Sequence, residues 1–157
     1  MEYSSPLWSG AISKEQLLTL ERIQPSVARR ILRGNFSTPK AELFQILEWP
    51  TLQWRRAVAS TLFLHGTLFN RPQQGILSKE IFPFAKSLSH HGLRQPFQLV
   101  LPTATSTRYL NSCLYYASLL WNSLPCSIQS IQNTAQFRIA LELHWYHAND
   151  SLSHNFI

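Results

Sequence analysis

Acidic side chains are scarce in this chain, and aspartate is almost absent. The 157 residues include eight carboxylates, and Asp150 is the only aspartate among them. Two-metal phosphoryl transfer requires clustered carboxylates that hold two cations about 3.5–4 Å apart, whereas the glutamates here are scattered along the sequence. The acid content therefore argues against metal-assisted polymerase or nuclease chemistry.

Other signatures of catalysis are missing as well. The sequence contains no glycine-rich phosphate loop, no Gly-x-Ser-x-Gly motif and no His-Glu-x-x-His motif. Its two cysteines, Cys113 and Cys126, have no Cys or His partner at zinc-finger spacing, which favours buried thiols over a disulfide or a zinc site. We expect no catalytic residue and no cofactor.

Export and membrane signals are not evident either. No positively charged segment followed by an apolar stretch opens the chain, and no apolar run approaches membrane-spanning length. Hydrophobic residues make up 45% of the sequence and charged residues 14%, a composition typical of a folded domain rather than a disordered chain. These features predict a soluble, intracellular protein.

Arginine is the charged residue that the chain does have in number. The net charge of +6 is carried by ten arginines against four lysines. The planar guanidinium group binds phosphate with two parallel hydrogen bonds, so basic proteins rich in arginine are candidates for nucleic-acid binding. Nucleic acid is therefore the first partner to test.

Hydrophobic periodicity and capping signals predict a mainly α fold: an irregular bundle of about five helices, with a loop-rich middle and at most one short strand or hairpin. The expected helices lie at about residues 13–33, 39–49, 51–69, 112–124 and from 134 onward. Residues 72–111 are expected to be loop-rich. Phe97–Leu101, which lies between Pro96 and Pro102, is the one run with strand character.

The first expected helix has the strongest local signals. Ser13 and Gln16 match a capping box, and Gly34 supplies a stop. If the helix continues through Pro25, one face is apolar and the roughly opposite face is basic. The apolar face comprises Leu20, Ile23, Val27 and Ile31, and the basic face comprises Arg22, Arg29 and Arg33. Arginines without an interleaved acid favour phosphate contact over a merely solvated surface.

The later helices carry their own signals. Thr38 is expected to cap the second helix, with Pro39 at its first position, and Thr51 is expected to cap the third. The predicted core stripe of the third helix is Leu52, Ala59, Leu62, Phe63 and Phe69, with Gly66 as a point of close packing. In the last helix, Phe137, Ala140 and Leu141 are expected to point inward. Trp121 is predicted to pack where the chain turns at Pro125, while Asn122 or Ser123 satisfies loose backbone groups.

Four C-terminal residues raise a metal site as an alternative. His144, His147, Asp150 and His154 would share a helical face and offer zinc ligands if one helix carried all four. Asn149-Asp150-Ser151 is typical of a helix end, which would separate them, and we expect the tail after residue 150 to be frayed. A small metal-dependent enzyme is therefore the weaker hypothesis, and no metal site is predicted.

Seven groups of residues, taken together and in order, resemble a known family. The groups are Glu2-Tyr3 with Trp8, Leu20-Glu21-Arg22-Ile23-Gln24, Ala28-Arg29-Arg30-Ile31, Trp49-Pro50-Thr51-Leu52 with Arg55-Arg56, Thr107-Arg108-Tyr109 with Ser112, Trp121-Asn122 with Leu124-Pro125, and Phe137-Arg138. Their order and spacing resemble the C-terminal region of non-LTR (LINE-type) retrotransposon reverse transcriptases. The likeness extends over residues 2–142 and concerns the thumb and the helical tail downstream of the catalytic palm.

The resemblance implies a thumb-like helical segment over residues 1–35 and a helical tail region over residues 36–157. In that family the palm holds the catalytic aspartates, including a Tyr-x-Asp-Asp turn, and this chain contains no such turn. The chain would then be a truncated, non-catalytic remnant of an RNA-directed DNA polymerase, with the missing palm as a former partner and the nucleus as its location. Since the thumb grips the template–primer backbone, the resemblance assigns nucleic-acid contacts to Arg22, Arg29, Arg30, Arg33, Arg55, Arg56 and Arg108.

A different class of function is also consistent with the residues. A helical protein-interaction module, or an orphan structural module, would have no nucleic-acid role, no membrane contact and no small-molecule substrate. It predicts an exposed apolar surface and self-association of the isolated chain, whereas backbone binding of nucleic acid predicts strong salt sensitivity.

Overall fold

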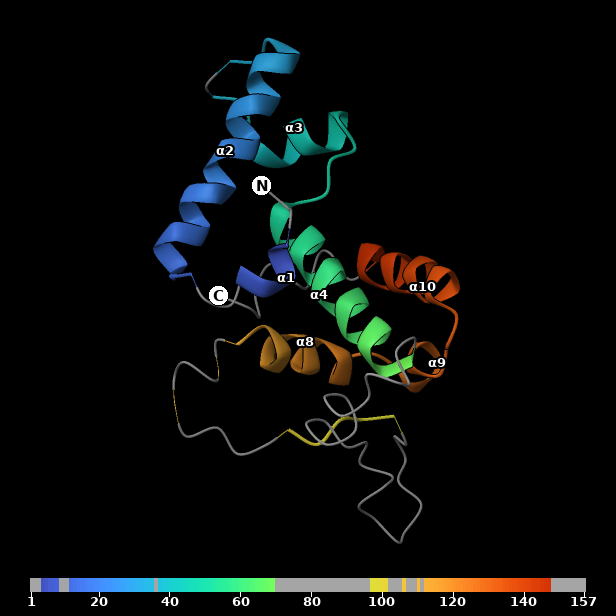
Figure 1. Ribbon diagram of the computed structural model, residues 1–157. Helices are drawn as coiled ribbons and strands as arrows, with labels where there is room; N and C mark the ends of the chain where they lie inside the picture. Colours follow the sequence, from blue (N-terminus) through green and yellow to red (C-terminus); the bar gives the residue numbers. More distant parts are fainter. Residues whose placement is uncertain are drawn as a thin grey trace, which may run out of the picture.

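The computed structural model describes residues 4–8, 12–35, 37–69, 97–101, 106, 110 and 112–147. The helices in this part are α1 (Ser5–Trp8), α2 (Lys14–Leu32), α3 (Lys40–Ile46), α4 (Leu52–Phe69), α8 (Cys113–Asn122), α9 (Cys126–Gln129) and α10 (Thr134–His147) (Figure 1). The described residues form no β-strand. The prediction of a mainly α fold is confirmed.

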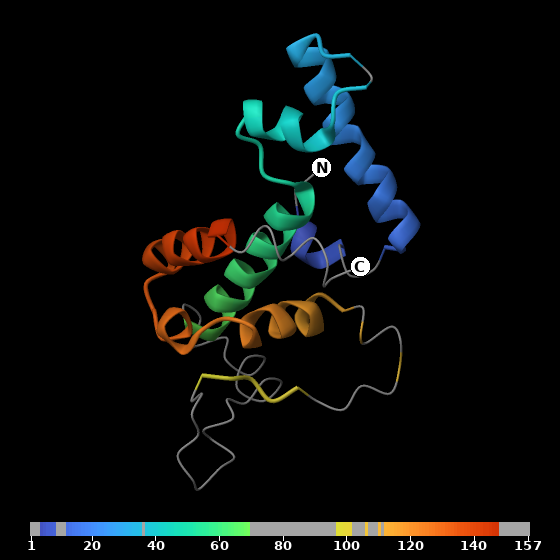
Figure 2. The same ribbon diagram turned by 180° about the vertical axis from the view of Figure 1, so that it is seen from behind.

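Helix α4 lies at the centre of the arrangement. Helices α1, α8 and α10 all contact it, and the views from front and back agree in placing α8 and α10 on different sides of α4 (Figures 1 and 2). Its buried positions include the small residues Ala57, Ser60 and Thr61, and α8 contributes the small buried residues Ala117 and Ser118. Small side chains let helix axes approach closely, so α4 is surrounded by other helices on several sides.

The main core forms where α4, α8, α9 and α10 meet. Its largest fully buried side chains include Trp121, Phe137, Leu64, Leu120 and Leu141. The rings of Trp121 and Phe137 stack with their centroids 5.6 Å apart, and Phe137 also stacks on His65 at 4.1 Å. The predicted inward direction of Phe137 and Leu141 is confirmed, and Ala140 packs against the same core.

The segment Trp121–Asn122 joins three parts of the chain. The indole Nε1 of Trp121 donates to the Phe97 carbonyl at 2.8 Å, and Gln129 Nε2 donates to the Trp121 carbonyl at 2.7 Å. The Asn122 side chain accepts from the Leu99 amide at 2.8 Å and donates to the Leu99 carbonyl at 2.9 Å. The expectation that Trp121 packs at the turn while Asn122 satisfies backbone groups is confirmed. Within the run at 97–101, which was predicted to have strand character, the backbone of Leu99 forms two hydrogen bonds with the side-chain amide of Asn122.

Helices α2 and α3 form a second, smaller core. Ala28, Leu43 and Phe44 are buried there, with Leu32, Leu47 and Trp49 packed around them. The Ser13–Gln16 capping box is present at the start of α2, and the helix continues through the buried Pro25 without interruption. Arg33 ends the helix in the left-handed conformation with φ 50°, and the Gly34 amide donates to the Arg29 carbonyl at 2.9 Å. The residue with the left-handed conformation that ends the helix is therefore Arg33, one residue before Gly34, which was predicted to end it.

The structure corrects three packing predictions. Ile23, Val27 and Ile31, expected inside, are 37%, 41% and 55% exposed, because α2 meets α3 and α4 through its Gln24–Ala28 side instead. On α4, Phe63 is 42% exposed, and a Cβ added at Gly66 would meet nothing within 4 Å, so Gly66 is not a close-packing point.

The capping predictions are confirmed in part. The predicted cap Thr51 accepts from the Trp54 amide through its hydroxyl group at the start of α4. Ser112 caps α8 in the same way by accepting from the Tyr115 amide, and this cap was not predicted. Helix α3 begins one residue later than expected, with Pro39 at its N-cap and no side-chain cap. Helix α9 was not predicted. Within the described residues, no helix combines the length and apolarity required to cross a bilayer.

Candidate nucleic-acid interface

Three exposed arginines lie along the outward side of α2. Arg22, Arg30 and Arg33 are all exposed, and the helical rise of about 1.5 Å per residue separates Arg22 from Arg30 by roughly 12 Å along the axis. The spacing Arg22–Ser26–Arg30 keeps these three residues on one face of the helix, and Arg33 is the exposed C-cap residue that follows its last turn. Between Arg22 and Arg30 the surface is hollowed, and the hollow is lined by Arg22, Ile23, Ser26, Val27 and Arg30. We call the exposed Arg22, Arg30 and Arg33 the arginine face.

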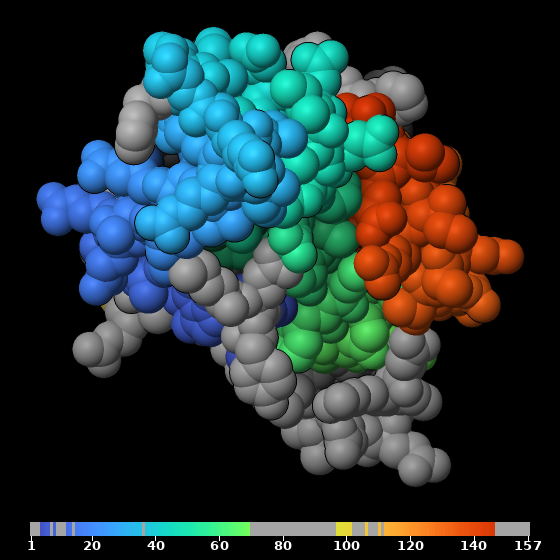
Figure 3. All heavy atoms as spheres, turned by 90° about the horizontal axis from the view of Figure 1, so that it is seen from above, coloured from blue at the N-terminus to red at the C-terminus, as the bar shows by residue number. Residues whose placement is uncertain are grey.

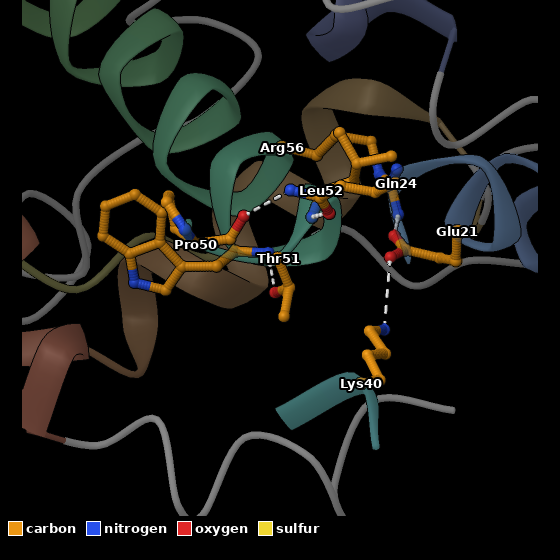
Figure 4. A network of polar contacts seen from close by, with 8 residues as sticks. Glu21, Gln24, Lys40, Pro50, Thr51, Leu52 and Arg56 are labelled. Atoms are coloured by element: carbon orange, nitrogen blue, oxygen red, sulfur yellow. Dashed lines mark hydrogen bonds and ion pairs between the residues drawn. The ribbon is translucent and has the colours of Figure 1, made fainter. Parts of the chain in front are cut away.

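Among the described residues, no carboxylate lies between these arginines, because Glu21, the acid in the middle of α2, is turned inward. Helix α2 contains Glu15 in its first turn and Glu21 in its middle. Glu21 Oε1 accepts a hydrogen bond from Arg56 Nη2 at 2.6 Å, and its Oε2 lies 3.9 Å from Lys40 Nζ (Figure 4). Since these two cations neutralise Glu21 on the inner side, the described residues on the outward side from Arg22 to Arg33 present positive charge alone.

A buried glutamine fixes which side of α2 faces outward. Gln24 is 8% exposed, and its Nε2 donates to the Pro50 carbonyl at 2.9 Å. Its Oε1 accepts from the Leu52 amide at 3.2 Å, an N–H at the start of α4 that no helical carbonyl can satisfy (Figure 4). Any rotation of α2 that turned the arginine face inward would break both bonds, and it would leave the buried Leu52 amide unpaired.

Arg29 lies at the inner edge of α2 and not with the other arginines. It is half-buried, its Nη2 donates to the Thr38 carbonyl at 3.4 Å, and its Nε is buried without a hydrogen-bond partner. The side chain thus ties α2 to the turn that precedes α3. The face expected to join Arg22, Arg29 and Arg33 joins Arg22, Arg30 and Arg33 instead.

The arginine pair at the start of α4 is divided between surface and interior. Arg55 is exposed, whereas Arg56 is only 7% exposed and pairs with Glu21. Burial raises the pKa of Tyr116, and the charge of Arg56 partly opposes that shift. Arg56 is therefore a buried link between helices, and its burial does not fit the predicted phosphate contact. Arg108 lies outside the described residues.

Of the residues considered for a metal site, His144 alone has its side chain in the described part of the chain. His144 is half-buried on α10, while the side chain of His147 and residues Asp150 and His154 lie outside the described residues. Among the described side chains, no group of three or more His, Cys, Asp or Glu is placed to hold a metal ion. Cys113 and Cys126 are free and half-buried, and burial raises the pKa of the Cys113 thiol.

Sequence reasoning missed two residues that build this interface. Gln24 and Glu21 were noted only as part of a resembling group, yet they set the rotation of α2 and remove the nearby negative charge. Their roles depend on contacts between 19 residues (Glu21 to Lys40) and 35 residues (Glu21 to Arg56) apart in sequence, which helical periodicity does not report. At about 100° per residue, Arg29 lies closer to Arg22 around the helix than Arg30 does, so spacing alone could not have grouped the arginine face, and only the contact of Arg29 with Thr38 sets it apart.

No protein-family model, curated protein or solved structure matches the chain.

Proposed function

We propose that this protein binds the sugar–phosphate backbone of nucleic acid through the arginine face of α2. The observation that carries the proposal is the alignment of Arg22, Arg30 and Arg33, all exposed, along a helix whose central carboxylate is neutralised on the opposite side. Guanidinium groups at such spacing can each neutralise one phosphate, which positions a protein on a nucleic acid without reading its bases.

The proposal includes the family resemblance. The chain would correspond to the thumb and post-thumb segment of a non-LTR retrotransposon reverse transcriptase, without catalytic activity of its own, and would act in the nucleus. Two of the resembling groups, at residues 20–24 and 49–56, contact each other through Gln24–Pro50, Gln24–Leu52 and Glu21–Arg56. These contacts support treating the two groups as parts of one structural unit that presents the arginine face.

The salt dependence of binding tests the proposal directly. A fluorescein-labelled RNA–DNA duplex would be titrated with dilute protein, and binding followed by fluorescence anisotropy at several NaCl concentrations. Neutralising three phosphates predicts a slope of about −2.7 in log K against log salt, or about forty-fold weaker binding for a four-fold rise in salt. Binding that ignores salt, or no binding at low salt, would contradict the proposal.

Single substitutions then locate the interface. Arg30→Gln should weaken binding at low salt and reduce the slope by about 0.9, because one phosphate contact is lost. Arg138→Gln is the matched control: Arg138 is also an exposed helical arginine, but it lies on α10 and pairs with Glu142 at 2.8 Å. Equal loss in the two variants would indicate a response to net charge and would contradict a localised arginine face.

A further inference from the structure

Helix α10 presents a second exposed surface, and this surface is apolar. Ile139, Leu143 and Tyr146 are 60%, 57% and 73% exposed, and their spacing of four and three residues places them in one stripe. We call Ile139, Leu143 and Tyr146 the α10 stripe. The opposite side of the helix holds Phe137, Leu141 and Trp145, all buried in the core. An apolar stripe backed by a fixed helix is the kind of surface that commonly binds another helix.

The helix that carries this stripe is well anchored and lies at the edge of the molecule. Asn133 Oδ1 accepts from the amides of Ala135 and Gln136 and so caps the helix start. Seen from above, α10 runs along one outer side beside α4, while α2 lies on the other side (Figure 3). A partner on the α10 stripe would therefore leave the arginine face uncovered.

The charges beside the stripe indicate what kind of partner fits. Arg138 and Glu142 flank it on one side and pair with each other at 2.8 Å, so the flank is neutral overall. A polyanion or an anionic lipid surface would gain little from such a flank. A helix with its own apolar stripe and one charge of each sign in reverse order would match both features. The antiparallel α10 of a second copy is such a helix.

We propose that two copies of this protein associate through antiparallel contact of their α10 stripes. A two-fold axis near the middle of the segment Arg138–Leu143 brings Ile139 close to Leu143 of the second copy. The same axis brings Arg138 close to Glu142 of the second copy, and the reverse, so each apolar and charged contact occurs twice. The proposal is independent of nucleic-acid binding.

The size of the surface sets the strength of the association. The fourteen residues of α10 span about 21 Å, and one face of a helix of this length presents less than the roughly 800 Å² per partner of a standard stable interface. The dimer is thus expected to be weak and concentration-dependent. Sedimentation velocity of the whole protein over a wide concentration range should show a monomer that converts progressively to a dimer.

Substitutions at two exposed aliphatic residues, Leu143 and Ile46, distinguish a specific contact of the α10 stripe from nonspecific hydrophobic association. Leu143→Lys should weaken dimerisation by about ten-fold or more, because a charge would enter an apolar contact. Ile46→Lys is the matched control, since Ile46 is 59% exposed at the end of α3, away from the stripe. A monomer at every concentration, or equal loss in both variants, would overturn the proposal. The proposal would also be overturned if the protein bound anionic vesicles through Leu143 and did not associate with a second copy.

Charge reversal provides a test that folding defects do not mimic. Arg138→Glu places two acids against each other across the dimer, and Glu142→Arg places two bases against each other, so each variant alone should dimerise less. Mixed together, they should form a heterodimer, because every cross-helix pair then joins opposite charges. Circular dichroism would verify that each variant is folded. Failure of two folded variants to associate when mixed would overturn the antiparallel register.

Discussion

At the scale of single residues, the described part of the core contains a titratable imidazole ring, that of His65. His65 is fully buried, and its Nε2 lies 2.8 Å from the Ile131 carbonyl. That contact requires a proton on Nε2, which leaves Nδ1 as a buried acceptor, and Nδ1 has no hydrogen-bond partner. The ring neighbours are Phe69, Trp121 and Phe137, none of them charged. A second proton on this ring would be a charge in an aromatic core.

Stability should accordingly fall in mild acid. Burial lowers the pKa of His65 from 6.5, although the hydrogen bond to Ile131 acts in the opposite direction. The unfolded chain therefore protonates this ring at a higher pH than the folded chain does, so the contribution of His65 to the free energy of unfolding should be fully present well above pH 6.5 and decrease below it. Urea unfolding on either side of pH 6.5 would measure the decrease.

The contribution of His65 can be separated from that of the other histidines by one substitution. His65→Gln keeps a side-chain donor for the Ile131 carbonyl but has no titrating group. Its stability at neutral pH should be lower because the ring contact with Phe137 is lost. Between neutral and mildly acidic pH it should lose less stability than the wild type. An unchanged pH dependence would show that His65 does not titrate in this range.

At the scale of a helix, Arg33 at the end of α2 affects both the stability of the protein and the proposed binding by the arginine face. Arg33 has φ 50°, a left-handed conformation that costs a non-glycine residue about 1 kcal/mol relative to glycine. Arg33→Gly should therefore raise stability by about 1 kcal/mol, or roughly 2–4 °C in Tm for a protein of this size. It should also weaken nucleic-acid binding and reduce the salt slope, because a phosphate contact is removed.

A second left-handed residue supplies the control for Arg33. Glu48, which follows α3, has φ 52° and is exposed. Glu48→Gly should give a similar gain in Tm without weakening nucleic-acid binding. Thermal unfolding and anisotropy on the two variants would show whether stability and binding separate as expected. A loss of binding in Glu48→Gly equal to that in Arg33→Gly would argue against a contact by the Arg33 side chain.

The elements that could be predicted from sequence are those with local causes. The Ser13–Gln16 capping box and the hydroxyl cap at Thr51 involve residues three apart, and both are present. The sidedness of α2 could not be predicted in this way. Ile23, Val27 and Ile31 form a better apolar stripe than the side with Gln24 and Ala28, but Gln24 finds Pro50 and Leu52 as partners, and a satisfied polar residue can be buried.

The candidate site was predictable to a similar extent. Of the predicted basic helix face, Arg22 and Arg33 are exposed, whereas Arg29 is half-buried and the exposed Arg30 takes its place. Contact of the arginine face with nucleic acid stays a prediction. Arg56 shows why the remainder was not predictable. Arg55 and Arg56 are adjacent in sequence and alike in type, yet one is exposed and the other is buried, because α4 turns by about 100° per residue and only the second meets Glu21.

At the scale of the whole molecule, one buried ion pair links α2 to α4. Arg56 Nη2 and Glu21 Oε1 are 2.6 Å apart, with side-chain exposures of 9% and 17%. Breaking such a pair by removing one partner leaves a charge with little water around it. Glu21→Leu should therefore destabilise the protein by about 3 kcal/mol. Urea unfolding of the variant and the wild type would measure the difference.

The matching double variant shows whether this arginine serves the fold or the interface. Glu21→Leu with Arg56→Met replaces the pair by apolar side chains and should recover most of the lost stability, since buried ion pairs often contribute little beyond what well-packed apolar groups provide. Its nucleic-acid binding should keep the wild-type salt slope, because Arg56 is inside, whereas Arg30→Gln should reduce that slope. Additive destabilisation in the double variant would contradict the coupling of Glu21 and Arg56. A reduced salt slope in the folded double variant would instead indicate that Arg56 contacts nucleic acid. The assignment of each arginine to folding or to binding would then have to change.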